Sequence, residues 1–265
     1  MEMILLLTAC VNPNGMSYTA LVDVDVRKKQ YEDALRWYLE ETKLRVVFVE
    51  NTGYDMSDEF IDYIHNGRLE MLTFLGNDYD RSLGKGYGEA LILDYGFQNS
   101  RFFSESGPDV LVVKVTGRLF CKNVNEIVKK YNSINTVYSN IGKDDWGGNM
   151  AVSNFVIAPK KFWVGYFLPR NNELNDSKHY HFEHLLYDSI TKWTNDGYKH
   201  KEFWTLPQIE GVSGTWGTII SSPLERCFQD KILYFLRRFF NYRGYINPFY
   251  KGNRNYEIHC NSKEV

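Results

Sequence analysis

Two cations, a threonine and a glycine follow an apolar run in the sequence DVLVVKVTGRLF. The run predicts a buried strand over Asp109–Lys114, and at its carboxyl end we expect Lys114, Thr116, Gly117 and Arg118. A guanidinium suits bidentate contact with a phosphate, and an ammonium acts there as a compact cation. This segment is therefore the first candidate for a phosphate site. The alternative is a turn flanked by two solvated cations.

Polar residues and glycines also follow the other apolar runs of the first half. They are Asn12 and Pro13 after the first run, Glu50, Asn51 and Gly53 after the second, and Gly84, Lys85 and Gly86 in the sequence GKGYGE. Glycines allow a backbone to approach a ligand closely, and Lys85 could counter the charge of a phosphate. The alternative for GKGYGE is a flexible turn before a helix.

The elements that must position these residues follow from hydrophobic periodicity. The expected strands are Met3–Thr8, Arg45–Glu50, Glu70–Leu75, Asp109–Lys114, Thr136–Asn140 and Ser153–Ala158. The expected helices are Arg27–Glu41, Ser57–His65 with Ser57 as N-cap, Gly86–Asn99 and Phe182–Thr194, and Leu206–Thr218 is expected to be loop-rich. This alternation predicts one α/β domain with a mostly parallel sheet flanked by helices. Ligands of such sheets bind beyond the carboxyl ends of the strands, so the segments above should surround one crevice.

Composition and missing motifs exclude several classes of protein. The 265 residues carry a formal net charge of -2, which gives no reason to expect nucleic-acid binding. The first loop has no GxGxxG, and neither GxxxxGK[ST] nor GxSxG occurs in the chain, which disfavours Rossmann dehydrogenases, P-loop enzymes and α/β-hydrolases. The four cysteines are widely spaced and form no CxxC pair, as expected for a protein of a reducing cytoplasm.

Four segments in order, ILLLTACVNP, VVFVENTGYD, GKGYGEA and VLVVKVTGRLF, resemble the nucleotide-sugar half of GT-A glycosyltransferases that build bacterial surface polysaccharides. The sequence is most similar to capsular and O-antigen (lipopolysaccharide) transferases with a K-[TS]-G-R-[YL] motif after the fourth strand. The typical GT-A enzyme has a metal-binding DxD at that point. The resemblance covers residues 3–120 well and residues 150–220 loosely.

The resemblance implies a GT-A-like catalytic domain over residues 1–228, divided into a nucleotide-sugar half (1–120) and an acceptor half (121–228). In this arrangement the loops at 12–14 and 50–53 would hold the nucleoside. Lys114 and Arg118 would stabilise the diphosphate leaving group by charge, which is the work of a metal in other members. We expect their removal to abolish transfer without harming the fold.

The acceptor side is also implied by the resemblance. In GT-A enzymes that invert the anomeric centre, a carboxylate near the start of a helix in the second half deprotonates the acceptor hydroxyl. Glu183 and Asp188 match that region, and Glu183 is preferred for its place in FEHLL, with a helix-surface carboxylate as an equal alternative. Without a positioned carboxylate, a retaining mechanism would apply. The loop EGVSGTWG would bind the acceptor through Gly211, Ser213, Gly214 and Trp216, or else form a turn capped by a buried tryptophan.

The departure from DxD favours an enzyme without a metal or other cofactor, although carboxylate pairs that could hold Mg²⁺ or Mn²⁺ occur elsewhere. These pairs are Asp23 and Asp25, Asp78 and Asp80, and Asp144 and Asp145. The sequence KHYHFEH places His179, His181 and His184 close together, but no carboxylate-plus-histidine set with recognised spacing follows. A zinc site there is disfavoured.

The sequence DKILYFLRRFFNYRGY predicts a basic amphipathic helix at Asp230–Tyr245, within a tail of residues 229–265. Such a helix suits the surface of an anionic bilayer, and packing on the catalytic domain is the alternative. No apolar stretch approaches the roughly 20 residues of a membrane span. We therefore expect a cytoplasmic protein, peripheral on the inner face of the cytoplasmic membrane.

Together these observations predict a glycosyltransferase of class EC 2.4 that moves a sugar from a nucleotide-sugar, with a UDP-sugar favoured, to a glycan or glycolipid acceptor. Two alternatives stay open. A sugar-phosphate nucleotidyltransferase has a related sheet, but usually has a glycine-rich signature with a lysine after the first strand, and residues 9–17 contain no lysine. A non-catalytic module that binds nucleotides or carbohydrates would differ only in lacking turnover.

Overall fold

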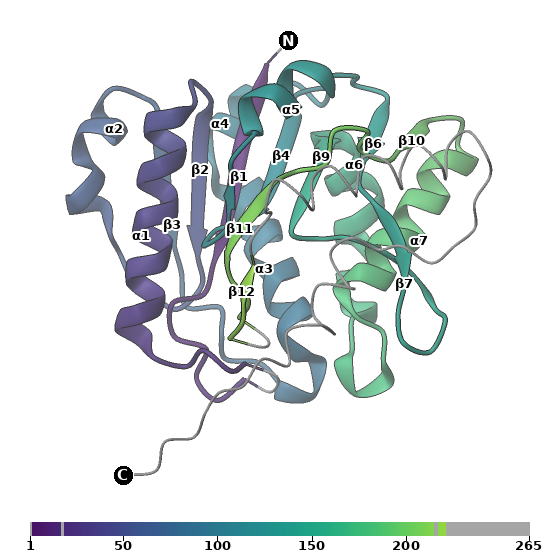
Figure 1. Ribbon diagram of the computed structural model, residues 1–265, viewed down its shortest axis with the longest axis horizontal. Coiled ribbons are helices and arrows are strands. Elements are labelled where there is room, and N and C mark those ends of the chain that lie inside the picture. Colours follow the sequence, from purple (N-terminus) through teal and green to yellow (C-terminus); the bar gives the residue numbers. More distant parts are fainter. Residues whose placement is uncertain (1, 17–18, 215–216, 221–265) are drawn as a thin grey trace.

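The computed structural model describes residues 2–16, 19–214 and 217–220. A seven-stranded sheet with the order β10-β6-β9-β4-β1-β2-β3 forms its centre (Figure 1). Four strands run parallel, namely β1 (Met3–Ala9), β2 (Arg45–Glu50), β3 (Leu69–Thr73) and β4 (Leu111–Thr116). Beyond β4, β9 (Phe155–Pro159) runs antiparallel to both its neighbours, and β6 (Thr136–Tyr138) pairs in parallel with β10 (Lys199–Lys201).

The central strands form because their side chains are apolar on both faces of the sheet. In β1, Ile4 and Leu6 pack into one core cluster, whereas Leu5 and Leu7 pack into the other, and all four are fully buried. This alternation is the period of two expected of a strand covered on both sides. Burial of each such side chain stabilises the fold by about 1.5–3 kcal/mol.

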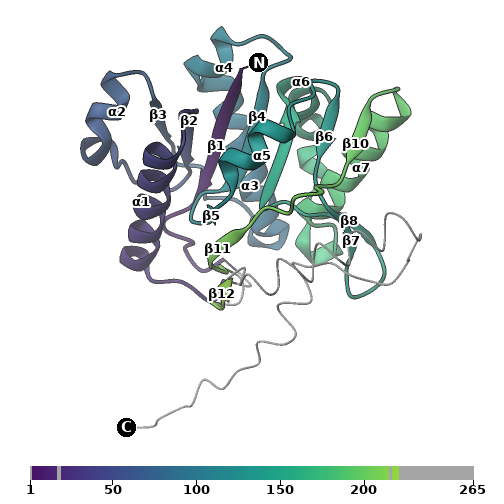
Figure 2. The same cartoon turned by 45° about the horizontal axis from the view of Figure 1, so that its top comes forward.

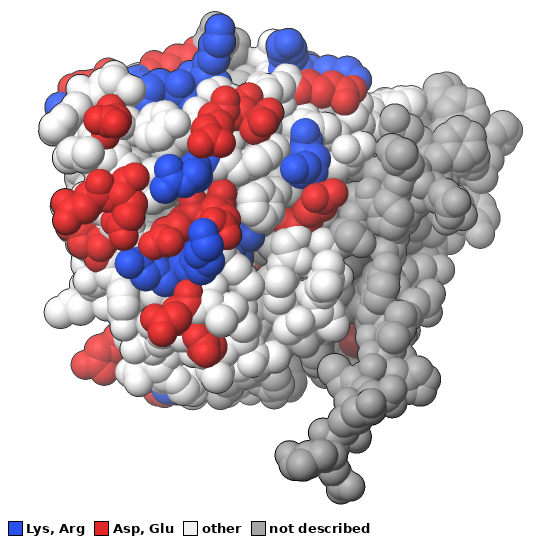
Figure 3. Space-filling view, turned by 60° about the vertical axis from the view of Figure 1, so that its left-hand side comes forward, with Lys and Arg blue, Asp and Glu red and all other residues white. Residues whose placement is uncertain are grey.

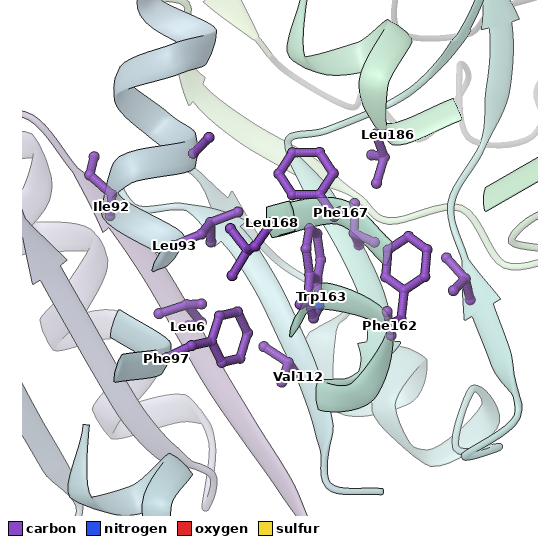
Figure 4. Packing of buried hydrophobic residues seen from close by; sticks show 14 of the residues in the cluster. Leu6, Ile92, Leu93, Phe97, Val112, Phe162, Trp163, Phe167, Leu168 and Leu186 are labelled. Atoms are coloured by element: carbon purple, nitrogen blue, oxygen red, sulfur yellow. The ribbon is translucent and has the colours of Figure 1, made fainter. Parts of the chain in front are cut away.

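Helices cover both faces of the sheet (Figure 2). On one face lie α1 (Val24–Glu41) and α5 (Val124–Lys130), which pack against Leu5 and Leu7. On the other face lie α3 (Gly84–Asn99), α4 (Arg101–Glu105), α6 (Lys160–Phe162) and α7 (Phe182–Asn195). Figure 4 shows this second core, where Leu93 and Leu168 lie beside Trp163 and Phe167.

Shorter elements complete the described chain. They are the 3-10 turns Ser57–Phe60, Arg81–Leu83, Leu168–Glu173 and Asp176–Lys178, the π-helical turn Trp163–Phe167, and α2 (Ile61–His65). The strands β7 (Ile141–Lys143) and β8 (Asn149–Ala151) form a hairpin. A small sheet contains β5 (Phe120–Cys121), β11 (Ile209–Val212) and β12 (Ile219–Ile220).

The predicted α/β class, with a mostly parallel sheet flanked by helices, is confirmed. Three local predictions are corrected. Ser57 begins a 3-10 turn instead of capping a helix, and Asp55 accepts its backbone N–H at 2.9 Å. The fourth strand extends to Thr116, and the stretch expected to be loop-rich contains β11. The predicted tail helix and Trp216 lie outside the described residues.

The face that carries α1 shows acidic and basic side chains mixed over its surface (Figure 3). On α1 they form short-range ion pairs, such as Lys28 with Glu32 at 3.3 Å and Lys29 with Asp33 at 2.6 Å. A nucleic-acid surface needs a field of one sign, which this mixed face does not provide. Among the helices of the described chain, none is long and apolar enough to cross a membrane.

Candidate active site

The candidate residues of both halves meet at one edge of the sheet, where the parallel strands end and where α3 and α7 begin. Lys114 lies two residues before the end of β4, and Ser153 lies two residues before the start of β9, which pairs with β4 in the antiparallel sense. The carboxyl end of β4 and the amino end of β9 are therefore side by side. This topology brings residues that are far apart in sequence into hydrogen-bond contact.

Lys114 is the centre of a buried polar network. Its side chain is 0% exposed, and Nζ lies 2.6 Å from Oε1 of Glu89 on α3. The same nitrogen donates to the backbone carbonyl of Ser153 at 2.6 Å and lies 5.2 Å from the ring centroid of Phe182. Glu89 also accepts a hydrogen bond from Oγ1 of Thr8 at 2.9 Å. Lys114, predicted to be a cation that faces a phosphate, is thus a buried member of an ion pair.

Glu183 joins this network from the other half of the chain. It lies in the first turn of α7, and its Oε1 accepts a hydrogen bond from Oγ of Ser153 at 2.7 Å. Ser153 therefore contacts Lys114 through its carbonyl and Glu183 through its hydroxyl. Asp188, the second candidate base, lies elsewhere and pairs with Tyr180 at 2.6 Å.

The sequence GKGYGE forms the first turns of α3 instead of a flexible loop. At Gly84, φ is +81°, and a Cβ there would lie 1.9 Å from Cγ of Asp176, so only glycine allows this approach. At Gly86 a Cβ would lie 3.0 Å from the backbone nitrogen of Phe182. The close approach that these glycines permit is made by the start of α7 and the turn before it. They pack the two helix starts together.

Lys85 is the second residue of α3 and is exposed to solvent. Desolvation of the Lys85 ammonium by the surrounding protein lowers its pKa, and the charges of Glu183 and Asp176 oppose this effect. Lys85 is therefore a solvent-accessible cation in the electrostatic field of the candidate base. It is better placed than Lys114 to meet an anion that arrives from solvent.

Arg118 connects the end of β4 to the predicted acceptor loop. Its Nε donates to the carbonyl of Val212 at 3.2 Å, and its Nη1 donates to the hydroxyl of Tyr31 at 3.2 Å. A Cβ at Gly214 would lie 2.2 Å from Nη2, so the loop backbone lies directly on the guanidinium. Of the other predicted acceptor residues, Gly211 lies in β11, and Ser213 donates its backbone N–H to Thr218 at 2.8 Å.

Thr116 and Gly117 are held by backbone hydrogen bonds at the same edge. The N–H of Thr116 donates to Asn154 at 3.1 Å, and that of Gly117 donates to the carbonyl of Thr8 at 2.8 Å. The segment that resembles the family motif therefore bridges β1 and the residues before β9. Its shape is fixed by the main chain.

Glu50 organises the loops that were predicted to hold a nucleoside. The carboxylate is fully buried, and it accepts backbone hydrogen bonds from Val11 at 3.0 Å, Thr52 at 2.8 Å and Tyr54 at 3.0 Å. The hydroxyls of Thr52 and Thr73 also donate to it. Both oxygens are thus used by protein donors, so Glu50 shapes the loops and presents no free carboxylate to a ribose.

Asn12, Pro13, Asn51 and Gly53 lie on those two loops. The N–H of Asn12 donates to Oγ1 of Thr52 at 3.2 Å, and its carbonyl accepts from Asn77 at 2.9 Å, which ties three strand ends together. Asn51 is 1% exposed, and its Oδ1 has no hydrogen-bond partner among the described residues. Gly53 has a φ of +83° in the turn after β2.

The histidines of KHYHFEH are not arranged to coordinate a metal ion together. In the described part of the chain, no three His, Cys, Asp or Glu residues are placed to hold an ion together. His184 Nε2 lies 3.0 Å from Oδ2 of Asp144. Burial raises the pKa of Asp144, but hydrogen bonds from the Gly148 N–H and from His184 outweigh it and lower the pKa below its usual value. Asp144 thus fastens the β7–β8 hairpin to α7.

Three residues of this site were not predicted from the sequence, namely Glu89, Ser153 and Asp176. Glu89 is the last residue of GKGYGE and follows Lys85 by four positions, which is one helical turn. The sequence could therefore have predicted that the two residues lie on the same face of the helix. Ser153 and Asp176 lie outside any pattern, because their partners are 30 or more residues away or depend on the approach at Gly84. No local signal could have identified them.

The chain matches no protein-family profile and no curated protein sequence. Among solved structures, 4-diphosphocytidyl-2C-methyl-D-erythritol synthase has a TM-score of 0.40 at 9% identity, covering 89% of this chain and 99% of its own. Core-mannan synthase A from Aspergillus fumigatus in its Mn/GDP form has a TM-score of 0.40 at 10% identity, covering 76% and 72%. A protein from Desulfovibrio desulfuricans that is described as a nucleotide-diphospho-sugar transferase has a TM-score of 0.39 at 15% identity. The match covers 77% of this chain and 80% of that protein. Structural similarities this weak support no inference about the function of this chain.

Proposed function

We propose that this protein transfers a sugar from a nucleotide-sugar, with a UDP-sugar favoured, to a hydroxyl of a glycan or glycolipid acceptor. The observation that carries the proposal is the contact between the two predicted halves of the site. Ser153 receives a hydrogen bond from Lys114 of the nucleotide-sugar half and donates one to Glu183 of the acceptor half. A transferase needs its leaving-group site and its proton-accepting site within one substrate length of each other.

In this proposal the charged residues have different tasks. Arg118 and Lys85 are the cations through which the diphosphate would be held, because both keep contact with solvent. Lys114 acts as a positioning residue, since its ammonium fixes Glu89 and the carbonyl of Ser153. The acceptor hydroxyl would lie at the first turn of α7, where Glu183 is the carboxylate predicted to receive its proton. A single displacement at the anomeric carbon then inverts the configuration of that carbon.

The place of this reaction in bacterial surface polysaccharide synthesis, on the inner face of the cytoplasmic membrane, is part of the proposal and rests on the sequence resemblance alone. The metal-independent character rests on it too, because the positions after β4 contain Arg118 in place of a carboxylate pair. Both features are open to direct tests. The metal requirement can be measured together with nucleotide binding.

A thermal-shift screen tests the proposal. UDP, GDP, CDP and dTDP and their sugar derivatives are added to the protein, each with EDTA and with Mn²⁺. A ligand at a hundredfold excess over its Kd stabilises the fold by about 2.7 kcal/mol, so binding raises Tm. We expect one nucleotide to raise Tm in EDTA, and we expect Arg118→Gln to lose most of that shift.

Arg101→Gln is the matched control, because Arg101 is an exposed arginine on α4, at the opposite edge of the sheet. It should keep the full shift. If no nucleotide raises Tm, the proposal fails. If a nucleotide binds but its sugar derivative is never consumed, the protein is a binding module and not a transferase.

A further inference from the structure

An aspartate and a histidine form a hydrogen-bonded pair immediately before α7. Nδ1 of His181 lies 2.8 Å from Oδ1 of Asp176, and the two side chains are 32% and 17% exposed. An ionised carboxylate only accepts hydrogen bonds, so the bond to Asp176 selects the ring form with a hydrogen on Nδ1, in competition with the backbone N–H of His184, which caps the same side chain. The neutral ring then has its lone pair on Nε2. Among the residues that the structure describes, none donates a hydrogen bond to that nitrogen.

His184 shows the contrasting arrangement one turn further along α7. Its Nδ1 accepts the backbone N–H of His181 at 3.1 Å, and its Nε2 lies against Asp144 at 3.0 Å. Both ring nitrogens of His184 are therefore used to hold the structure. The bond to the His181 N–H also fixes the backbone from which the His181 ring projects.

Asp176 packs against the start of α3. Its carboxylate lies directly over Gly84, where a Cβ would be only 1.9 Å away. The pair thus stands between the starts of α3 and α7, which also carry Lys85 and Glu183. The groups that face the His181 ring are Asp176, Glu183 and Lys85, and the rings of His179 and His184 lie 6.4 and 5.4 Å from it between centroids.

We propose that His181, oriented by Asp176, is the group that accepts the proton of the acceptor hydroxyl, while Glu183 orients that hydroxyl. This inference rests on the proposed function and moves the proton-accepting role, predicted for Glu183, to His181. Glu183 is less suited to take the proton because its Oε1 already accepts a hydrogen bond from Oγ of Ser153 at 2.7 Å. Within the described ranges, no residue donates a hydrogen bond to Nε2 of His181.

The step balances without another reactant. The hydroxyl oxygen forms a bond to the anomeric carbon, and its proton moves to Nε2 of His181. The bond from the anomeric carbon to the diphosphate oxygen breaks, and its electron pair leaves with the nucleoside diphosphate. The imidazolium is stabilised by Asp176 until the proton passes to solvent, in the way that a carboxylate supports a histidine base in other enzymes.

The charge environment gives this base a pH signature. The hydrogen bond to Asp176 raises the pKa of His181 most, burial lowers it, and the charges of Asp176 and Glu183 raise it further. His181 must be neutral to accept a proton, so activity should fall as pH falls through this raised pKa. Asp176→Asn removes the main cause of the raised pKa of His181. The acidic limb of the pH–activity profile, where activity falls with falling pH, should therefore move to lower pH.

The ring tautomer is a test that needs no substrate. Two-bond ¹H–¹⁵N correlation spectra of the full chain distinguish the two neutral forms of each histidine, and His181→Gln identifies the signal. We expect neutral His181 to carry its hydrogen on Nδ1. A hydrogen on Nε2 would overturn the proposal, because that nitrogen could then accept no proton.

Kinetics provide the second test, with the UDP-, GDP-, CDP- and dTDP-sugars of the binding screen as donors. We expect His181→Gln to lower kcat by about 10²- to 10³-fold, the usual contribution of a general base, while the nucleotide-induced rise in Tm persists. Glu183→Gln should lose activity, but its pH–activity profile should still show the acidic limb. His65→Gln, an exposed histidine at the end of α2, is the control and should match the wild type.

The two proposals fail in different ways. If wild-type protein consumes a donor and His181→Gln retains kcat within about threefold, His181 is not the base and only this inference is overturned. The same holds if Glu183→Gln, but not His181→Gln, removes the acidic limb. If wild-type protein consumes none of these donors, the proposed function falls, and this inference falls with it.

Discussion

Lys114 connects the two halves of the site at the scale of single residues. Its side chain is 0% exposed, and its ammonium pairs with Glu89, whose side chain is 22% exposed. A buried charge without its partner is costly, because desolvation is no longer offset by attraction. The expectation that Lys114 could be removed without harm to the fold is therefore reversed by its burial.

We predict that Lys114→Met lowers the free energy of unfolding by about 3 kcal/mol, in the range for a broken buried ion pair. The double variant Lys114→Met/Glu89→Gln should regain part of this loss, since it leaves no unpaired carboxylate. Urea unfolding of wild type, both single variants and the double variant gives the coupling energy. Additive effects of the two changes would contradict an ion pair in solution.

At the scale of elements, the site depends on the approach of α3 to α7. The two helices come from different halves of the chain, and their first turns meet at Gly84 and Gly86. Lys85 and Glu89 of α3 reach the site, as does Glu183 of α7, only because these helix starts lie against each other. The glycines are therefore part of the positioning of the charged side chains, although no ligand contact is needed to explain them.

We predict that Gly84→Ala destabilises the protein by about 3 kcal/mol, which combines left-handed backbone strain of about 1–2 kcal/mol with overpacking. Its Cβ would displace Asp176, so activity should fall as well. Gly107→Ala is the control, because nothing lies within 4 Å of a Cβ there, and it should change stability by less than about 0.5 kcal/mol. Equal Tm values for the two variants would contradict the packing of α3 described here.

At the scale of the whole molecule, much of the fold could be predicted from the sequence. The strands β1, β2 and β4 are long apolar runs because they are buried on both faces, and this signal is strong. The rule that ligands bind beyond the strand ends also located the edge of the sheet where Arg118, Lys85 and Glu183 come together. Short elements such as β5 and the 3-10 turns carry too few residues to show a period.

The state of individual side chains at that edge could not be predicted in the same way. Glu50 and Lys114 follow or end apolar strands and therefore looked like ligand-facing groups. Their burial depends on partners from distant segments, namely Thr73 for Glu50, and Glu89 and Ser153 for Lys114. Local sequence patterns contain no information on such pairings. The pair of Asp176 and His181 is local, with the two residues five positions apart, but it was missed because its geometry depends on a turn packed against α3.

The central claim is that a nucleotide binds at the carboxyl edge of the parallel strands. Hydrogen exchange measured by mass spectrometry, with UDP, GDP, CDP and dTDP added in turn, tests it most directly. We predict that one of them slows exchange in residues 10–15, 50–55, 116–119 and 211–214, and leaves residues 101–110 at the opposite edge unchanged. Protection confined to other segments, or none with any of the four nucleotides, would contradict the account.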